Sequence, residues 1–397
     1  MKILLKKFFG GGGYDKLSEH ESWMSKLENI QISGLLIFSS EKRRKKKEKK
    51  RMKNKLGKVL RTMLLTLTIV LMYSMSVSAA SGQASIGNKN YATVQKALNA
   101  VQNGQTIKLN QDITLNKALL FKKNVKYTFD MNKHKVTSKV ADSDTVGGFD
   151  VQSGNVTFTN GTTSAAVFVH EKATVTVKDG TYAQVTNWGK TTIKNGKVVN
   201  KDYSAICNYK GTMVINKVTA RANYNCIYAE GGTVTVNGGN YKAANSQTTY
   251  PLVYSKKATV YLKGGSYTTT QAIAVYNEKG KVTISGGNYG KGNSGFKGVI
   301  VNFNSMTIKG GTFISDNYAA ALFCGENSST VISGGKFTAK GDVVDIYSGR
   351  KKLLVNGGTY QGIAAFSFVW NENNTKIDKS KIKLVGSTRY KITYYVG

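Results

Sequence analysis

The sequence predicts an all-β protein dominated by a parallel β-helix, a solenoid whose short strands pair with those of the coils before and after. Three observations support this fold class. An eight-residue pattern of alternating apolar residues, a glycine turn, a small polar residue and an aromatic residue recurs along the chain. Its copies lie about 22 residues apart, which suits one coil of a β-helix. The 397 residues include 42 glycines but one proline, as expected for strands and tight turns, because proline cannot donate to a sheet ladder.

The pattern is clearest in seven copies. They read VTVKDGTY (175–182), VTVNGGNY (234–241), VYLKGGSY (260–267), VTISGGNY (282–289), MTIKGGTF (306–313), TVISGGKF (330–337) and LLVNGGTY (353–360). Between successive copies lies a second short apolar run, for example at 252–254 and 273–276. Two or three short strands in about 22 residues make one coil, whereas a propeller blade needs about 40 residues or more.

The first 80 residues read as export segments. An apolar stretch at 63–77 follows four basic residues and precedes small residues at 77–81, which predicts a secretory signal peptide over 52–80, cleaved after Ala79 or Ala80. An uncleaved anchor is the alternative. Residues 1–51, with the basic run 41–51, are expected to be a non-native leader or a disordered basic segment, and Met52 is expected to be the natural start. The predicted location is therefore outside a bacterial cell, secreted or on the surface.

The remaining chain divides into a cap, a solenoid and a second cap. Residues 81–115 are expected to form the N-terminal cap and first strand, because Val94, Ala97, Leu98 and Val101 fall on one face of a short helix that Gly104 ends. The parallel β-helix is expected over 116–370. Over 371–397, alternating lysine-rich segments predict capping strands whose charge discourages pairing with neighbours.

Two segments carry a family resemblance. YATVQKALNAVQNGQTIKLNQDITL (91–115) and YTFDMNKHKV (127–136) resemble the capping helix, first strand and early coil of right-handed parallel β-helix proteins of the pectate-lyase-like superfamily. The resemblance covers roughly residues 86–370 and implies a right-handed solenoid with a short N-terminal capping helix. It does not specify an activity, because that fold carries lyases, hydrolases, adhesins and phage fibres.

The net charge of +35 bears on the partner. Residues 1–80 hold 18 of the 57 basic and 6 of the 22 acidic side chains, so a third of the charge belongs to the export segments. The rest is dispersed lysine with only three arginines, and lysine lacks the bidentate guanidinium fork. We expect no nucleic-acid partner, no membrane contact after signal cleavage, and a monomer that binds a polysaccharide or an anionic cell-envelope polymer.

A polar stripe on the pattern's strands is the first candidate site. Side chains alternate across a strand, so the residues between the apolar pair point outward. The stripe comprises Thr176, Lys178, Thr192, Lys194, Lys263, Thr283, Thr307 and Lys309, with Thr157 and Thr235 in equivalent places. One interpretation is a docking face for an anionic polymer such as uronic-acid polysaccharide or wall teichoic acid. The other is ordinary β-propensity and solubility.

Three other sets of residues are interpreted structurally. The aromatic residues that end the copies, Tyr182, Tyr241, Tyr267, Tyr289, Phe313, Phe337 and Tyr360, are expected to stack inside the solenoid rather than to bind sugars. Asn187, Asn208, Asn277 and Asn302 are expected to satisfy backbone groups in turns. Cys207 and Cys226 are either a disulfide across adjacent coils, on one face of the sheet, or buried thiols, and Cys324 has no obvious partner.

Evidence for catalysis is sparse in the sequence. No Cys/His cluster has zinc spacing, and no metal site or cofactor is expected; Ca²⁺ enters only if the protein is a lyase. The best catalytic candidates are Asp342, Asp345 and Arg350, with Glu326 one coil earlier, and the alternative is a charged turn. The leading hypothesis is an adhesin-like carbohydrate-binding protein. The alternatives are a lyase or glycoside hydrolase acting on uronic-acid polymers, and a purely structural surface module.

Overall fold

The computed structural model describes residues 82–140, 148–244, 249–269, 273–290, 298–316 and 318–394, together with helical positions 48–49, 51–52, 54–55 and 57–58. The chain divides into two units, residues 1–79 and 80–397. The predicted signal peptide and leader lie almost wholly outside the described residues. Where the structure describes the chain, no helix is long and apolar enough to cross a membrane.

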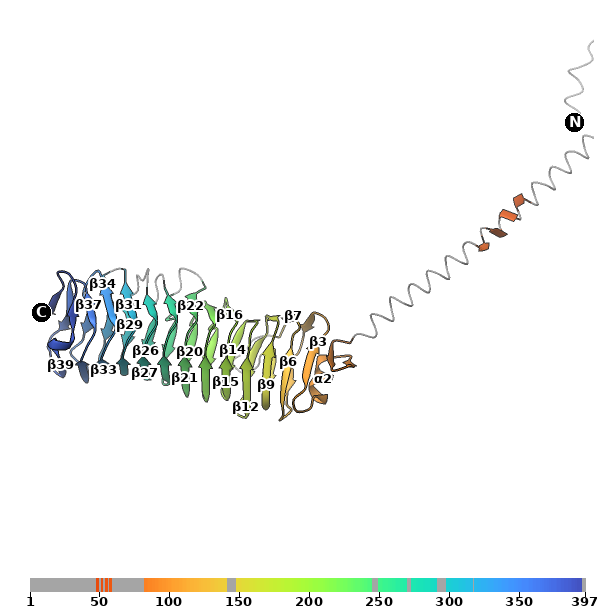
Figure 1. Cartoon of the computed structure of the whole chain (residues 1–397), viewed down its shortest axis with the longest axis horizontal. Coiled ribbons are helices and arrows are strands. Elements are labelled where there is room, and N and C mark those ends of the chain that lie inside the picture. Colours follow the sequence, from red (N-terminus) through yellow and green to blue (C-terminus); the bar gives the residue numbers. More distant parts are fainter. Residues whose placement is uncertain are drawn as a thin grey trace, which may run out of the picture. The chain divides into compact units, whose positions relative to one another are not determined.

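The second unit is a parallel β-helix, as predicted, with three sheets that run along its length (Figure 1). Sheet A contains, in spatial order, β2 (Lys89–Tyr91), β1 (Ala84–Ile86), β3 (Thr106–Leu109), β6 (Lys126–Asp130), β9 (Gly154–Thr159), β12 (Ala173–Val177), β15 (Lys190–Ile193), β18 (Thr212–Ile215), β21 (Thr233–Val236), β24 (Thr259–Leu262), β27 (Lys281–Ile284), β30 (Ser305–Ile308), β33 (Ser329–Ile332), β36 (Lys352–Val355) and β39 (Thr375–Ile377).

Sheet B contains β4 (Ile113–Leu115), β7 (Lys135–Ser138), β10 (Thr162–Thr163), β13 (Thr181–Tyr182), β16 (Lys197–Asn200), β19 (Thr219–Ala222), β22 (Asn240–Ala243), β25 (Ser266–Thr268), β28 (Asn288–Gly290), β31 (Thr312–Ser315), β34 (Lys336–Ala339), β37 (Thr359–Gln361) and β40 (Lys383–Leu384).

Sheet C contains β5 (Leu119–Phe121), β8 (Phe149–Val151), β11 (Ala166–Val169), β14 (Gln184–Asn187), β17 (Ile206–Asn208), β20 (Ile227–Ala229), β23 (Val253–Ser255), β26 (Val275–Asn277), β29 (Gly298–Asn302), β32 (Ala320–Cys324), β35 (Val344–Ile346), β38 (Ala364–Val369) and β41 (Arg389–Tyr394).

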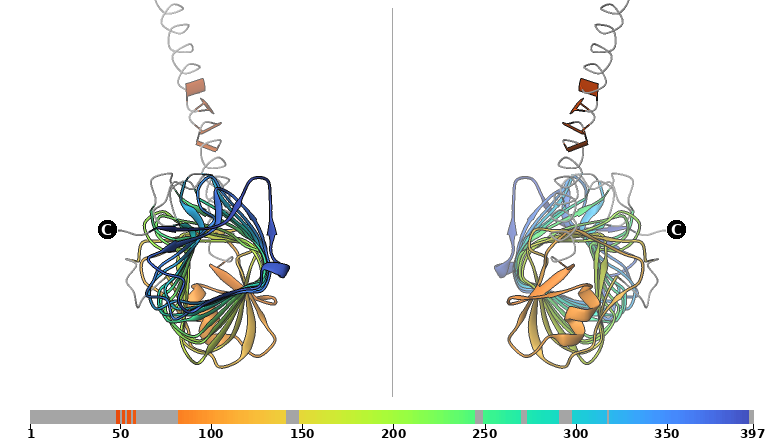
Figure 2. Two further views of the ribbon diagram at one scale, coloured as in Figure 1. Left: turned by 90° about the vertical axis from the view of Figure 1, so that its left-hand side faces the viewer. Right: turned by 90° about the vertical axis from the view of Figure 1, so that its right-hand side faces the viewer.

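Each coil runs through sheets A, B and C in turn, and each strand of the solenoid pairs in parallel with the next coil. Viewed along the solenoid, the coils overlie one another around a common core (Figure 2). The recurring pattern explains this geometry. Its two apolar residues, such as Val234 and Val236, are buried and paired with Val260 and Leu262 of the next coil. Its second glycine makes the turn from sheet A to sheet B at positive φ, for example +118° at Gly239, where a side chain is strained.

The two ends of the solenoid differ in part from the sequence expectations. Helix α2 spans Val94–Ala100, buries Val94, Ala97 and Leu98, and ends before Gly104 is reached. Thr93 begins it by accepting a hydrogen bond from the backbone of Lys96. The role of α2 as a cap stays a prediction. At the other end, β39, β40 and β41, with the short 3₁₀-helix η2 (Lys379–Lys381), continue sheets A, B and C as one more coil.

Candidate functional site

The outer face of sheet C carries a column of tyrosines. β20, β23 and β26 each place a tyrosine at the middle position, between two buried residues, so Tyr228, Tyr254 and Tyr276 point outward. Strand register aligns the three on successive coils. Their ring centroids are 5.6 Å apart at both steps, so they form a continuous half-buried aromatic surface.

A second column of tyrosines comes from the turns between sheets B and C. Tyr203, Tyr224 and Tyr250 are 52%, 37% and 47% exposed, and their rings lie 6.1 and 4.5 Å apart. Hydrogen bonds between the residues that follow them hold the turns in register. The Asn225 side chain donates to the carbonyl of Pro251 at 2.6 Å, and the Ser204 hydroxyl accepts from the Asn225 backbone at 3.2 Å. Because Pro251 also has a fixed φ, this wall is pre-organised.

The two columns line a groove of about 900 Å³, which we call the tyrosine groove. Its lining residues are Gln184, Tyr203, Ser204, Cys207, Tyr209, Tyr224, Asn225, Tyr228, Tyr250, Pro251, Tyr254, Ile273 and Tyr276. Seven of these thirteen are tyrosines, and none carries a formal charge. The volume and the aromatic lining with a few polar groups are typical of a ligand site.

Carboxylates fix the hydroxyls on the floor of the groove. Tyr228 donates to Glu230 at 2.8 Å, and Tyr254 donates to Glu278. Desolvation, reinforced by these glutamates, raises the pKa of both tyrosines, so the phenols stay protonated. Glu230 also pairs with Lys256 at 3.0 Å. The hydroxyl protons of Tyr228 and Tyr254 are thus donated to the glutamates, and their phenol oxygens remain as hydrogen-bond acceptors on the floor.

Further aromatic contacts extend the floor along the solenoid. Toward the N-terminal end, Trp188 stacks on Tyr209 with ring centroids 4.9 Å apart and planes 8° apart. Toward the C-terminal end, Tyr276 contacts Phe303 at 5.6 Å. All of these rings are partly exposed, whereas the next ring, Phe323, is buried. The exposed floor therefore runs from Trp188 to Phe303.

The aromatic residues that end the repeated pattern lie inside the solenoid, as predicted. They are buried, and consecutive rings from Tyr241 to Tyr360 stack at 4.6–5.2 Å with nearly parallel planes. Each hydroxyl, such as that of Tyr267, donates to a carbonyl in the preceding turn. This column has no face available to a sugar. The buried asparagine ladder is also present: the Asn187 side chain donates to Asn208 at 2.7 Å, and that of Asn277 donates to Asn302 at 2.8 Å.

The threonine and lysine stripe lies on the outer side of sheet A, but it is interrupted. Thr176 pairs with Thr192 and Thr283 pairs with Thr307 on adjacent coils, and all four are partly exposed. Val214 and Tyr261 occupy the same column on other coils. The exposed Lys178 and Lys194 lie on adjacent coils, whereas the coil of Ser285 separates Lys263 from Lys309. A ligand role for these residues stays a prediction.

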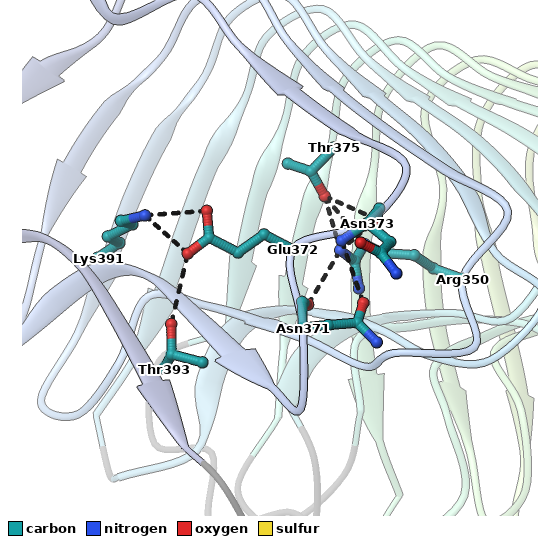
Figure 3. Close-up of polar contacts among 7 residues, drawn as sticks. All are labelled: Arg350, Asn371, Glu372, Asn373, Thr375, Lys391 and Thr393. Carbon is teal, nitrogen blue, oxygen red and sulfur yellow. Dashed lines mark hydrogen bonds and ion pairs between the residues drawn. The ribbon is translucent and has the colours of Figure 1, made fainter.

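The hydrogen-bond partners of Arg350 are backbone carbonyls and a threonine rather than the other catalytic candidates. Arg350 is 2% exposed, and its guanidinium donates to the carbonyls of Tyr347, Asn371 and Asn373 and to the Thr375 hydroxyl, near a Glu372–Lys391 ion pair (Figure 3). The guanidinium is therefore fully engaged in holding the last turns between sheets C and A. Exposed Glu326 lies beside Gly349 in the same set of turns.

Asp342 and Asp345 do lie near each other. Asp345 points outward from β35, and desolvation together with the charge of Asp342 raises the pKa of Asp345 to about 7. One oxygen of Asp342 accepts from the Tyr394 hydroxyl at 3.1 Å, and the other is buried without a hydrogen-bond partner. Of the four candidates, this pair alone has the electrostatic coupling expected of an acid–base site.

All three cysteines are buried, and no disulfide joins Cys207 and Cys226, so of the two alternatives the structure has the buried thiols. Both Ala205 and Ile206 face the core, so the side chains do not alternate there. Cys207 consequently lines the groove, in register with Tyr228, whereas Cys226 contacts backbone carbonyls inside the solenoid. Among the described residues, no three His, Cys, Asp or Glu side chains are grouped to hold a metal ion.

The tyrosine groove was not predicted from the sequence. Its floor residues stand in the second apolar run of each coil, and its wall residues stand in turns outside the repeated pattern. A tyrosine at the middle of three consecutive runs was the available signal. Comparison with protein-family models, curated proteins and solved structures found no match to the chain.

Proposed function

We propose that the protein is exported and binds a polysaccharide in the tyrosine groove, in the manner of a surface adhesin. One observation carries the proposal: seven tyrosines line a 900 Å³ groove on the outside of a rigid solenoid. Sugar rings have an apolar C–H face and hydroxyls at their edges, so they complement partly exposed phenol rings that combine an aromatic face with a polar group. The proposed export rests on the signal-peptide pattern at 52–80.

The resemblance of residues 86–370 to the pectate-lyase-like superfamily is compatible with the same proposal, because adhesins are among the proteins that share that fold. A binding protein needs no catalytic group. The groove is suited to binding alone, since none of its thirteen lining residues carries a formal charge.

The test is binding of the full chain to a panel of polysaccharides by affinity electrophoresis and calorimetry. Tyr254→Ala and Tyr224→Ala remove a ring from the floor and from the wall. Each is expected to weaken binding at least about tenfold, as for an aromatic hot spot. Tyr261→Ala is the matched control, because Tyr261 is also 37% exposed but lies on sheet A. Equal losses in all three variants, or no binding by the wild type, would contradict the proposal.

Sheet A supports an anionic polymer as a second ligand. From β12 to β36, the outward positions of its strands and the residues just after them carry seven lysines and no carboxylate. The seven are Lys178, Lys190, Lys194, Lys263, Lys281, Lys309 and Lys352. None of them has an ion-pair partner in the described part of the chain, so a polyanion would relieve their mutual repulsion. Retention on teichoic acid or polygalacturonate that falls with salt and with K178E/K263E/K309E tests this ligand.

A glycoside hydrolase or lyase is the remaining candidate, favoured by the Asp342–Asp345 pair. A carboxylate with a pKa of about 7 is suited to proton transfer at neutral pH. The full chain is to be incubated with neutral and uronic-acid polymers, with and without Ca²⁺, while reducing ends and unsaturated products are followed. Turnover that disappears in Asp345→Asn supports catalysis, and its persistence there excludes this pair.

A further inference from the structure

The direction of the tyrosine groove follows from the coil geometry. The wall rings of Tyr203, Tyr224 and Tyr250 belong to three consecutive coils, and so do the floor rings of Tyr228, Tyr254 and Tyr276. Consecutive coils of a parallel sheet are about 4.8 Å apart. Both columns therefore run along the solenoid axis, and the space between them is a channel parallel to that axis.

The floor continues beyond the wall. Tyr209 lies in the groove lining, and its ring is stacked nearly face to face on Trp188. The wall tyrosines begin only at Tyr203, and Cys207 and Thr186 continue the column of Tyr228. Trp188 lies two residues beyond that column, so it extends the floor obliquely, outside the groove proper. A ligand long enough to leave the groove at this end meets a partly exposed indole ring.

The polar groups disfavour an anion. The groove lining contains no lysine or arginine, and the floor hydroxyls of Tyr228 and Tyr254 point their protons at Glu230 and Glu278. The nearby Lys256 and Lys279 approach these same carboxylates, at 3.0 and 3.9 Å. What remains for a ligand at the floor is a set of oxygen acceptors, and the two carboxylates are balanced by these two lysines, so no cation is left over for an anionic group. Such a surface accepts hydroxyl or amide donors, whereas a carboxylate or sulfate group would lose its hydration there without gaining a cation or a free donor.

We infer that the ligand of the tyrosine groove is a linear, uncharged polysaccharide that lies parallel to the solenoid axis within the groove and extends obliquely from it onto Trp188. This inference rests on the proposed carbohydrate-binding function and specifies its ligand. It differs from the proposal for sheet A, in which an anionic polymer binds the lysines, because here a neutral polysaccharide binds the groove. The sugars stack between two aromatic columns, and their hydroxyls donate to the phenol and carboxylate oxygens.

The test is calorimetric titration of the full chain with neutral oligosaccharides, from dimers to octamers, and with oligogalacturonates of the same lengths. The neutral series comprises xylo-, cello-, manno- and N-acetylchito-oligosaccharides. We expect at least one neutral series to bind with an affinity that rises with length, and oligogalacturonates to bind at least tenfold more weakly. Trp188→Ala should weaken octamer binding several-fold and leave shorter ligands that stay in the groove unaffected. Glu278→Gln keeps an acceptor for Tyr254 and should improve oligogalacturonate binding selectively.

The outcomes separate the inference from the proposed function. If no neutral or acidic oligosaccharide binds at any length, both fall. If binding occurs and is lost in Tyr254→Ala but not in Tyr261→Ala, the proposed function stands. The inference is then overturned by dimers that bind as tightly as octamers, by an octamer affinity indifferent to Trp188→Ala, or by oligogalacturonates that match the neutral series. A shift of wild-type tryptophan emission that occurs only with the longer oligosaccharides and is absent from Trp188→Ala supports the extended binding mode.

Discussion

Replacement of Tyr267 by alanine is expected to destabilise the solenoid strongly, whereas the same change at Tyr254 is not. Tyr267 is fully buried between Tyr241 and Tyr289, with ring centroids at 4.7 and 4.6 Å and planes within 9° of parallel. Removing a buried aromatic ring costs about 3–5 kcal/mol through lost burial and the cavity left behind. Tyr254 is partly exposed on the outer face of sheet C and leaves no enclosed cavity when truncated, so Tyr254→Ala is expected to lower the free energy of unfolding by about 1 kcal/mol or less.

Tyr267→Phe separates the ring from the hydroxyl. The hydroxyl donates to the Gly264 carbonyl at 3.1 Å, and losing one such bond costs about 0.5–1.5 kcal/mol. The expected order of destabilisation is therefore Tyr267→Ala, then Tyr267→Phe, with Tyr254→Ala no larger than the latter.

The assay is urea-induced unfolding, followed by far-ultraviolet circular dichroism, with the free energy of unfolding extrapolated to water. Glycan affinity measured on the same samples should show the reverse order, because Tyr254 lines the groove in which we propose that the ligand binds and Tyr267 does not. The reasoning is refuted if Tyr267→Ala costs less than about 1 kcal/mol, or if Tyr254→Ala destabilises as much as Tyr267→Ala.

Three further predictions concern charge and backbone. Because burial raises the pKa of Asp345 from 3.8 to about 7, the folded chain holds a proton that the unfolded chain releases. The free energy of unfolding should therefore fall from about pH 4 to pH 7, and Asp345→Asn should flatten that slope in urea titrations at several pH values. Gly265→Ala should lower the thermal midpoint of unfolding more than Gly87→Ala does. Gly265 has a φ of +108°, and an added Cβ would lie 3.2–3.3 Å from tyrosine ring atoms, whereas Gly87 has a φ of +56° and open space around it. Arg350→Ala should lower the free energy of unfolding by at least about 2 kcal/mol, because it leaves buried carbonyls without their donor. A smaller decrease, measured by chemical unfolding, would reject the structural role of Arg350.

The solenoid could be predicted because its pattern is local and repeated. Alternation fixes which residues face the core, and the left-handed glycine fixes where each coil turns from sheet A to sheet B. The buried column through Tyr241 and Tyr267 could be predicted from the same pattern, because an aromatic residue two positions after a constant turn points the same way in every coil. Position within a repeat is enough to assign such residues to the interior.

The tyrosine groove could not be predicted in this way, because its wall belongs to turns. Tyr203, Tyr224 and Tyr250 are 21 and 26 residues apart, and no strand periodicity fixes the direction of a side chain in a turn of changing length. The surroundings of Arg350 could not be predicted for a related reason. It is five residues from Asp345 in the sequence, but the chain leaves sheet C between them, and the guanidinium turns into the carbonyls of the next coil. Proximity in sequence does not imply a shared face once a turn intervenes.

The floor of the groove shows how the fold and the site are separated within one strand. On β17, β20, β23, β26 and β29, the inward residue aligned from coil to coil is always Ile or Val. The adjoining outward residue is Cys207, then Tyr228, Tyr254 and Tyr276, and then Val301. The inward residues maintain the stack, so the outward ones are free to differ between coils without altering it. The tyrosine column thus occupies three coils of a much longer scaffold, and the number of coils that carry an outward tyrosine would set the length of the ligand that we propose for the groove.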